Sequence, residues 1–259
     1  MTSTLPKVSA VMPACYGEMA MLAVQCFRSQ TYGGDTELIV MDNNADGSTI
    51  ENLLPEDPRI KYFRVDKLPV GTLRNMGNAH ATGDIIVNWD CDDWSHPERI
   101  GEQVGWLIGT GKAVTGFHSI YYFEIGNGST YKYHFEPNRP HIPYACGSSQ
   151  MYLRTWWEKH QFPSTGIEDY AFQAEAQAAN QLDSRDGSQL LVARAHNGSV
   201  CYPTQLGKHR QFPVVPKSDL PPAFYAAIAP KAKPPKKSTA TPVAKPATQT
   251  TSPTGQEDN

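Results

Sequence analysis

One stretch of the chain decides the expected fold: Asp84-Ile85-Ile86-Val87-Asn88-Trp89-Asp90-Cys91-Asp92-Asp93. It begins with a short apolar run, Ile85 to Trp89, which is typical of a strand buried in a sheet. It ends in three carboxylates within four residues. Carboxylates this close repel one another, and a bound cation relieves the repulsion; hard oxygen ligands select Mg²⁺ or Mn²⁺. Taken alone, the segment also fits a solvated acidic turn.

Strands and helices alternate before this stretch. Apolar runs predict strands at residues 8–13, 38–41 and 60–65, and apolar residues at helical spacing predict helices at 18–30 and 72–81. This order with short connections predicts parallel strands joined by right-handed crossovers, and therefore an α/β fold. Ligands bind at the carboxyl ends of such strands.

The loop after the second strand is polar and reads Asp42-Asn43-Asn44-Ala45-Asp46-Gly47-Ser48. It imitates the start of an EF-hand calcium loop, with oxygen side chains at the first, third and fifth positions. The bidentate glutamate that such a loop needs is replaced by Leu53, and no helix leads into it. We therefore interpret this loop as a ligand contact at the end of a parallel strand.

Arg74 stands in the first turn of the helix predicted at 72–81. A cation there interacts unfavourably with the helix dipole. The position makes sense if Arg74 faces an anion such as a diphosphate. An exposed arginine is the alternative.

The second half of the chain leaves strict alternation. After a helix at 97–107, two strands at 113–124 and 130–135 flank a Gly-Asn-Gly-Ser hairpin signal. This pattern predicts an antiparallel addition that receives a second substrate. A helix from about 166 to 182 and a last strand at 190–195 complete the pattern.

Composition limits the function classes. The 259 residues suffice for a full core, and no apolar run is long enough for a transmembrane helix. Residues 1–7 lack the features of a signal peptide. The five cysteines are scattered without a Cys-x-x-Cys pair, which argues against a disulfide framework and a zinc site and favours a reducing cytoplasm.

The net charge of −3 hides an asymmetry. From Pro230 onward five lysines and two acids give +3, while 18 basic and 24 acidic residues in the remainder give −6. An acidic body does not suggest a nucleic-acid binder. We expect a folded domain at 1–212 and a Pro/Lys/Ala/Thr-rich disordered tail at 213–259. The lysines of this tail offer a peripheral contact with the inner face of an anionic membrane; a plain solvated tail is the alternative.

Together these signals resemble a family 2 glycosyltransferase with the GT-A fold, over roughly residues 7–202. The resemblance rests on motifs that are weak singly but specific in this order: the strand at 8–13, Met41-Asp42-Asn43-Asn44, Arg74-Asn75-x-Gly77, Asp90-Cys91-Asp92-Asp93 and Gly166-x-Glu168-Asp169-Tyr170. It implies a Rossmann-like mixed sheet flanked by helices, with a nucleotide-binding half at about 1–110 and a small antiparallel acceptor half at about 111–212.

The resemblance also implies a reaction and its residues. The family transfers a sugar from a nucleoside-diphosphate donor, here expected to be a UDP-sugar, to an acceptor hydroxyl with inversion. The acceptor is an unidentified glycan, lipid-linked glycan or protein. The implied metal ligands for Mn²⁺ or Mg²⁺ are Asp93, Asp92 and His196. The implied catalytic residues are Asp169 as general base and Glu168 beside it. The implied nucleotide and donor contacts are Pro13, Tyr16, Asp42, Asn43, Arg74, Asp90 and Asp92.

The chain departs from the family pattern at two places. Ala14-Cys15-Tyr16-Gly17 stands where Thr-Tyr-Asn is common, so that Tyr16 would have to stack on the base from a shifted position. Asn43 stands where an aspartate is common, and its carbonyl oxygen can still accept a hydrogen bond from uracil.

Three other functions compete with this interpretation. A sugar-nucleotide pyrophosphorylase would carry a Gly-rich basic loop after the first strand, which is missing here. A catalytically inactive nucleotide- or carbohydrate-binding relative would not need the intact acids Asp92, Asp93 and Asp169. A scaffold would depend on the tail from Pro230 onward.

Overall fold

The computed structural model describes residues 5–15, 17–44, 49–135, 143–165, 167–199 and 212–229. Residues 1–228 form one compact unit, and residues 229–259 form a second that, apart from Ala229, lies outside the described residues. Within the described parts of the chain, no helix is long and apolar enough to cross a membrane.

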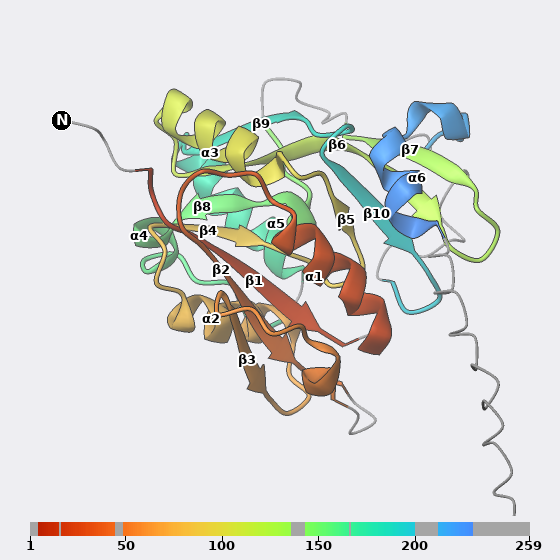
Figure 1. The fold of residues 1–259 in the computed structure, drawn as a ribbon. Helices are drawn as coiled ribbons and strands as arrows, with labels where there is room; N and C mark the ends of the chain where they lie inside the picture. Colours follow the sequence, from red (N-terminus) through yellow and green to blue (C-terminus); the bar gives the residue numbers. More distant parts are fainter. Residues whose placement is uncertain are drawn as a thin grey trace, which may run out of the picture. The chain divides into compact units, whose positions relative to one another are not determined.

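The first half of the chain forms the predicted parallel sheet, in the order β3-β2-β1-β4 (Figure 1). The apolar runs form strands close to their expected bounds. These strands are β1 (Val8–Ala14), β2 (Thr36–Asp42), β3 (Ile60–Arg64) and β4 (Ile85–Asn88). The connecting helices are α1 (Ala20–Arg28) and α2 (Val70–His80), with short 3₁₀ turns η1 (Gly17–Met19) and η2 (Glu51–Leu53).

Helices α1 and α2 cover opposite faces of this sheet (Figure 1). Alternate side chains of a strand point to opposite faces. Ala10 and Met12 of β1 accordingly share a buried cluster with Phe27 of α1, whereas Val11 lies in another with Leu73 of α2. Strands β1, β2 and β4 are buried on both sides, which explains their apolar runs, whereas the edge strand β3 is only partly buried.

The second half extends the same sheet to the order β3-β2-β1-β4-β8-β6-β10-β5, while β7 and β9 pair with β6. Strand β8 joins the halves because it pairs antiparallel with both β4 and β6. The predicted hairpin of β6 and β7 is confirmed, but β9 and β10 pair with β6 in parallel. The addition is therefore mixed rather than antiparallel throughout. Its strands are β5 (Trp94–Ser95), β6 (Val114–Glu124), β7 (Thr130–His134), β8 (Met151–Leu153), β9 (Leu182–Asp186) and β10 (Leu191–Ala195).

Three helices and one 3₁₀ turn accompany these strands: α3 (Arg99–Thr110), η3 (Gly147–Ser149), α4 (Arg154–Trp157) and α5 (Glu168–Ala178). The helix predicted to reach residue 182 ends at Ala178. Asn180 adopts the left-handed conformation with φ 53°, which stops the helix and lets Leu182 start β9.

The expected tail boundary at residue 213 is too early. The turn η4 (Lys217–Asp219) and helix α6 (Pro222–Ile228) belong to the compact unit. Phe224 of α6 is fully buried, with its ring centroid 5.8 Å from that of Trp94 and 5.2 Å from that of Phe123. Helix α6 thus buries an apolar side chain against the folded domain, and the proline-rich composition of this segment gave no indication of that packing.

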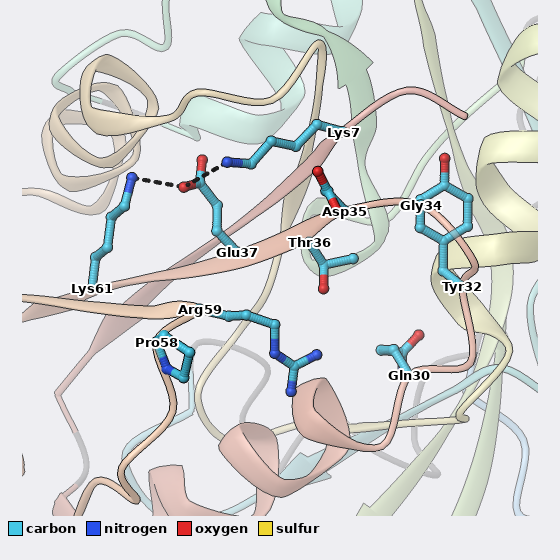
Figure 2. A pocket seen from close by; sticks show the side chains of 10 residues that line it. All are labelled: Lys7, Gln30, Tyr32, Gly34, Asp35, Thr36, Glu37, Pro58, Arg59 and Lys61. Carbon is cyan, nitrogen blue, oxygen red and sulfur yellow. Dashed lines mark ion pairs between the residues drawn. The ribbon is translucent and has the colours of Figure 1, made fainter. Parts of the chain in front are cut away.

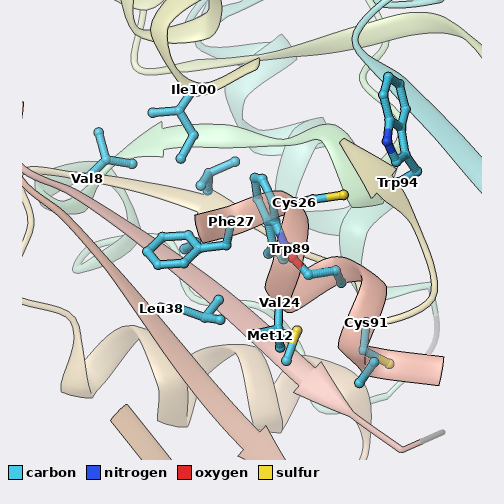
Figure 3. Close-up of a cluster of buried hydrophobic side chains, with 14 of the residues drawn as sticks. Val8, Met12, Val24, Cys26, Phe27, Leu38, Trp89, Cys91, Trp94 and Ile100 are labelled. Carbon is cyan, nitrogen blue, oxygen red and sulfur yellow. Dashed lines mark hydrogen bonds between the residues drawn. The ribbon is translucent and has the colours of Figure 1, made fainter. Parts of the chain in front are cut away.

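Trp89 anchors the end of β4 (Figure 3). It stands immediately before residues 90–93, which we call the acidic turn. Its indole Nε1 donates to the backbone carbonyl of Ala23 at 3.0 Å, and its ring meets Phe27 edge to face with centroids 6.3 Å apart. An indole that is both buried and hydrogen-bonded fixes the strand end that carries the acids.

Candidate active site

The acidic turn follows β4 at the carboxyl end of the parallel strands, where the sequence predicts the site. Side-chain exposure is 31% for Asp90 and 17% for Asp92, and Asp93 is buried. Burial raises the pKa of Asp93 well above its ordinary value, and the charges of Asp92 and Asp90 raise it further. Burial also raises the pKa of Asp90, against the opposing effect of Arg74. The ionised carboxylates thus destabilise one another, which a cation would relieve.

His196 lies where the sequence expects it, directly after β10 and beside the acidic turn. Its Nε2 is 3.1 Å from Oδ2 of Asp92. The donor set of Asp92, Asp93 and His196 therefore lies along one edge of the sheet. Among the described residues, no three such side chains converge closely enough to hold a metal by themselves. This arrangement suits Mg²⁺ or Mn²⁺, which take one or two carboxylates and complete their shell with substrate phosphates and water.

Arg194 is a site residue that sequence reasoning missed. Its Nε donates to the backbone carbonyl of Asp92 at 2.5 Å and its Nη2 to that of Met19 at 2.9 Å. Its backbone N–H donates to Oδ1 of Asp93 at 3.3 Å. Arg194 thereby ties the acidic turn to the β1–α1 connection. The only signal was its spacing, because Arg194 and His196 are alternate residues at one strand end.

Arg74 faces anions, as expected, but these are carboxylates of the protein. Its buried guanidinium lies 3.2 Å from Asp90 through Nη2 and 3.7 Å from Glu168 through Nε. Its Nη1 is buried without a hydrogen-bond partner. Gly71 of α2 lets Pro163 and Glu168 approach this helix closely, because a Cβ there would lie 2.1 Å from the carbonyl oxygen of Pro163 and 3.1 Å from Cβ of Glu168. The predicted contact between Arg74 and a donor diphosphate stays a prediction.

Glu168 and Asp169 open helix α5 and approach the acidic turn through Arg74. Asp169 packs against the backbone of η3, since a Cβ at Gly147 would lie 2.1 Å from its Oδ2. Its Oδ1 accepts from the backbone N–H of Tyr170 at 2.7 Å. The pKa of Glu168 is raised, mainly because the carboxyl is buried and also because Asp169 lies near it; the charge of Arg74 acts in the opposite direction. The expected base and the acidic turn thus belong to one charged network.

The residues expected to contact the nucleotide base of the donor make hydrogen bonds to other residues of the protein. Fully buried Asp42 accepts hydrogen bonds at Oδ1 from Asn44 and Arg64 and at Oδ2 from Ile50 and Tyr62. Although burial raises the pKa of Asp42, these hydrogen bonds hold it below its ordinary value. The structure therefore gives Asp42 a role in holding its own loop.

Two further residues that were predicted to contact the donor lie near Asp42. The side chain of Asn43 brackets the backbone of Leu68, accepting from its N–H at 3.1 Å and donating to its carbonyl at 3.4 Å. Pro13 lies buried in β1. Tyr16 lies outside the described residues. None of these contacts tests a role in nucleotide binding.

A pocket of about 380 Å³ lies at the opposite ends of the parallel strands from the acidic turn, between the starts of β1, β2 and β3 (Figure 2). Its lysines, Lys7 and Lys61, lie 3.5 and 2.7 Å from Oε2 of Glu37, and Arg59 pairs with Asp57. Burial would raise the pKa of Glu37, but Lys61, Ser9 and Thr82 lower it to about 2. These charges are satisfied internally, so the pocket is not our candidate site.

Comparison with known proteins identifies the family. The model of glycosyl transferase family 2 matches residues 9–166, a range that contains the acidic turn. The chain belongs to glycosyl transferase family 2. The expected family and enzyme class are therefore confirmed.

Two curated relatives agree with this family assignment. An uncharacterized glycosyltransferase of Haemophilus influenzae is 26% identical over 182 residues, which is 65% of this chain and 70% of the relative. The GalNAc(5)-diNAcBac-PP-undecaprenol beta-1,3-glucosyltransferase of Campylobacter jejuni is 31% identical over 96 residues, which is 34% of this chain and only 30% of that enzyme.

Solved structures confirm the GT-A fold. Residues 1–349 of S. aureus TarS match with TM-score 0.58 and 16% identity, covering 73% of this chain and 60% of that one. The mannosyltransferase PcManGT from Pyrobaculum calidifontis, in complex with GDP-Man and Mn²⁺, matches with TM-score 0.57 and 17% identity, covering 77% and 59%. The family 2 chain described here thus spans about 60% of these structures.

Proposed function

We propose that this family 2 glycosyltransferase transfers a sugar from a UDP-sugar to an acceptor hydroxyl with inversion at the sugar carbon, in polysaccharide or glycoconjugate synthesis. The observation that carries the proposal is the charged network from the acidic turn through Arg74 to Glu168 at the start of α5. The network supports the proposal because it links the acidic turn, proposed to hold the cation, to the segment that carries the proposed base. A module for binding alone would need no base.

The residues divide the chemistry between them. Asp92 and Asp93, with His196 beside them, would hold Mn²⁺ or Mg²⁺, which stabilises the charge gathering on the leaving diphosphate. Asp169 accepts the proton of the acceptor hydroxyl as attack develops, because an alcohol is a poor nucleophile until it loses that proton. Arg74 fixes the distance between Asp90 and Glu168. A single displacement gives inversion and requires no protein nucleophile.

Support for the donor comes from the residues and from the neighbours. The Oδ1 of Asn43 accepts one hydrogen bond from Leu68, and its second lone pair could accept from uracil N3–H. TarS has been solved with UDP and with UDP-GlcNAc, whereas PcManGT was solved with GDP-Man. Both bases therefore occur among proteins of this fold, and uridine is our proposal for this chain.

For the acceptor we propose a glycan, with a lipid-linked one as the first to examine. The Campylobacter relative is named for a glycan on undecaprenyl diphosphate. Ile167 and Tyr170, on either side of the candidate base, expose apolar side chains. We further propose that the protein acts in the cytoplasm, at the inner face of the membrane, where its C-terminal lysines would meet anionic lipid.

Calorimetric titration of the full chain with UDP, GDP and CDP tests the proposal, each with Mn²⁺ and with EDTA. Binding of UDP that requires Mn²⁺ is the expected result. Metal-dependent binding of GDP or CDP instead would overturn the choice of uridine. Binding of none of them by folded protein would favour an inactive relative.

A further inference from the structure

The guanidinium of Arg99, at the start of α3, is buried and makes its hydrogen bonds to neutral acceptors. Arg99 is 1% exposed. Its Nε donates to Oε1 of Gln103 at 3.1 Å and its Nη1 to Oγ of Ser95 at 2.8 Å. Its Nη2 donates to the backbone carbonyls of Asn88 at 3.0 Å and Ser148 at 2.7 Å. Bringing a charge into the core without an ion pair is costly, so the position of these acceptors matters.

The two carbonyls that Nη2 holds belong to the two sides of the candidate site. Asn88 ends β4, two residues before Asp90. Ser148 is the middle residue of η3, the turn whose backbone packs against Asp169. Both hydrogen bonds come from one nitrogen, whose N–H bonds point in fixed directions within the planar guanidinium. Arg99 therefore sets the separation between the strand that carries the acidic turn and the turn that supports Asp169.

Each of the three carbonyls of η3 accepts a hydrogen bond from a side chain of another element. Nδ2 of Asn88 donates to the first at 2.9 Å, Arg99 holds the second, and Nε2 of Gln103 donates to the third at 2.8 Å. Strand β4, in contrast, is fixed by backbone pairing with β1 on one side and β8 on the other. Loss of Arg99 should consequently release η3 and leave the acidic turn in place.

We propose that Arg99 is a positioning residue that fixes η3, and through η3 the candidate base Asp169, relative to the acidic turn. The effect on catalysis rests on the proposed function, whereas the hold on η3 does not. A substitution of Arg99 displaces the base and leaves the residues proposed to bind the donor where they are. Misplacing a reacting group by about 1 Å can cost on the order of 10²-fold in rate.

Hydrogen exchange measured by mass spectrometry tests the hold on η3 in the full chain. Arg99→Met is the test variant, because an apolar residue of similar length often replaces a buried charge without loss of stability. We expect faster exchange than in wild type at residues 147–150 and unchanged exchange at 85–89. Arg154→Met is the matched control, since Nη1 of Arg154 also donates to a backbone carbonyl, that of Ala81 at 3.0 Å.

Unchanged exchange at 147–150 in folded Arg99→Met would overturn the proposal, as would equal acceleration by Arg154→Met. Should Arg99→Met fail to fold, Gln103→Leu takes its place, because it removes the donor to the third carbonyl of η3 and keeps the charge of Arg99. The same acceleration at 147–150 is then expected, and its absence would count against the proposal in the same way.

The catalytic consequence is measured as release of UDP from UDP-GlcNAc and from UDP-glucose with Mn²⁺, with water as the acceptor. Arg99→Met should lower kcat roughly tenfold or more and leave the donor KM unchanged. In an Asp169→Asn background the same change should lower kcat no further, because the base through which Arg99 acts has been removed. Losses that multiply in the double variant would show that Arg99 acts on the fold as a whole.

Failure of the proposed function is distinguishable from failure of this inference. If wild type binds no UDP with Mn²⁺, or if Asp169→Asn turns over normally, the proposed donor or the proposed base is wrong. Exchange at 147–150 still decides in both cases whether Arg99 holds η3.

Discussion

The side chain of Arg194 donates a hydrogen bond to the backbone carbonyl of Asp92 at 2.5 Å, joining residues from opposite halves of the sequence. The same guanidinium holds the carbonyl of Met19. It contacts carbonyl oxygens and leaves the carboxylates of the acidic turn to other partners. Arg194 thus positions the acidic turn, where we propose that the donor binds.

Arg194→Gln should raise the KM for donor and the Mn²⁺ concentration at half-maximal rate on the order of tenfold, with a smaller effect on kcat. A hydrogen bond from a charged donor contributes about 1.5–3 kcal/mol. Steady-state kinetics at varied Mn²⁺ measures both quantities. Arg185→Gln is the control, because Arg185 pairs with Asp183 at the surface. Equal effects of the two changes would contradict the assignment.

Asp169→Asn should reduce kcat roughly 10²–10⁴-fold, the usual contribution of a general base. Donor binding should stay intact, because Asp169 is proposed to accept the proton of the acceptor hydroxyl and not to hold the metal or the donor. Single-turnover assays and calorimetry separate the two effects. Asp183→Asn on β9 provides a matched carboxylate control. Near-normal turnover in Asp169→Asn would move the base elsewhere, with Glu168 the next candidate.

Asp93→Asn should weaken Mn²⁺-dependent nucleotide binding and at the same time stabilise the fold. The change removes one of three mutually repelling carboxylates while keeping an acceptor for the Arg194 backbone N–H. A gain of about 1 kcal/mol corresponds to a rise in Tm of about 2–4 °C for a chain of this size. Thermal melts with EDTA measure it. A lower Tm would show that Asp93 contributes to folding.

Acid should destabilise the wild type through Glu37, whose pKa falls from 4.5 to about 2 on folding. A depressed pKa contributes stability above the ordinary value, and this contribution is lost as the pH falls toward 2. Glu37→Gln should therefore be less stable at pH 7 and less sensitive to pH between about 4.5 and 2. Denaturant unfolding at several pH values measures this. Parallel curves for the two proteins would exclude Glu37 as the cause.

Truncation should separate the C-terminal helix from the residues beyond it. Removal of residues 230–259 should leave the Tm unchanged, whereas removal of 213–259 exposes Trp94 and Phe123 by deleting Phe224. Loss of a buried phenylalanine side chain alone destabilises by about 3–5 kcal/mol. Phe224→Ala in the full chain separates this packing from chain length. Equal melting of both truncated forms would contradict the role of α6.

The sequence predicted the first half of the fold well because its signals are local. Three of the apolar runs there are strands buried on both faces, the fourth is the partly buried edge strand β3, and each helix carries its own apolar stripe. The acidic turn was found for the same reason, since Asp90, Asp92 and Asp93 are neighbours in the chain. His196 was placed in the site only through the family resemblance; its Nε2 lies 3.1 Å from Oδ2 of Asp92, and its role as a metal ligand stays a prediction.

The remainder depends on contacts that leave no local pattern. Strand β8 is only three residues long and is defined by its two neighbours. The partners of Arg74 and Arg194 come from segments far away in sequence, and a charged residue does not reveal which carboxylate or carbonyl it will meet. The five hydrogen bonds to Asp42 likewise converge from four separate positions.

The place of β8 has a consequence for synthesis on the ribosome. Strand β4 ends at Asn88, but the strand that covers its open edge begins at Met151. At about 5–20 residues per second, a nascent chain exposes this apolar edge for several seconds after β4 emerges. An exposed strand edge invites pairing with other chains. The protein therefore has most need of a chaperone during the time in which the ribosome synthesises the segment from Asn88 to Met151.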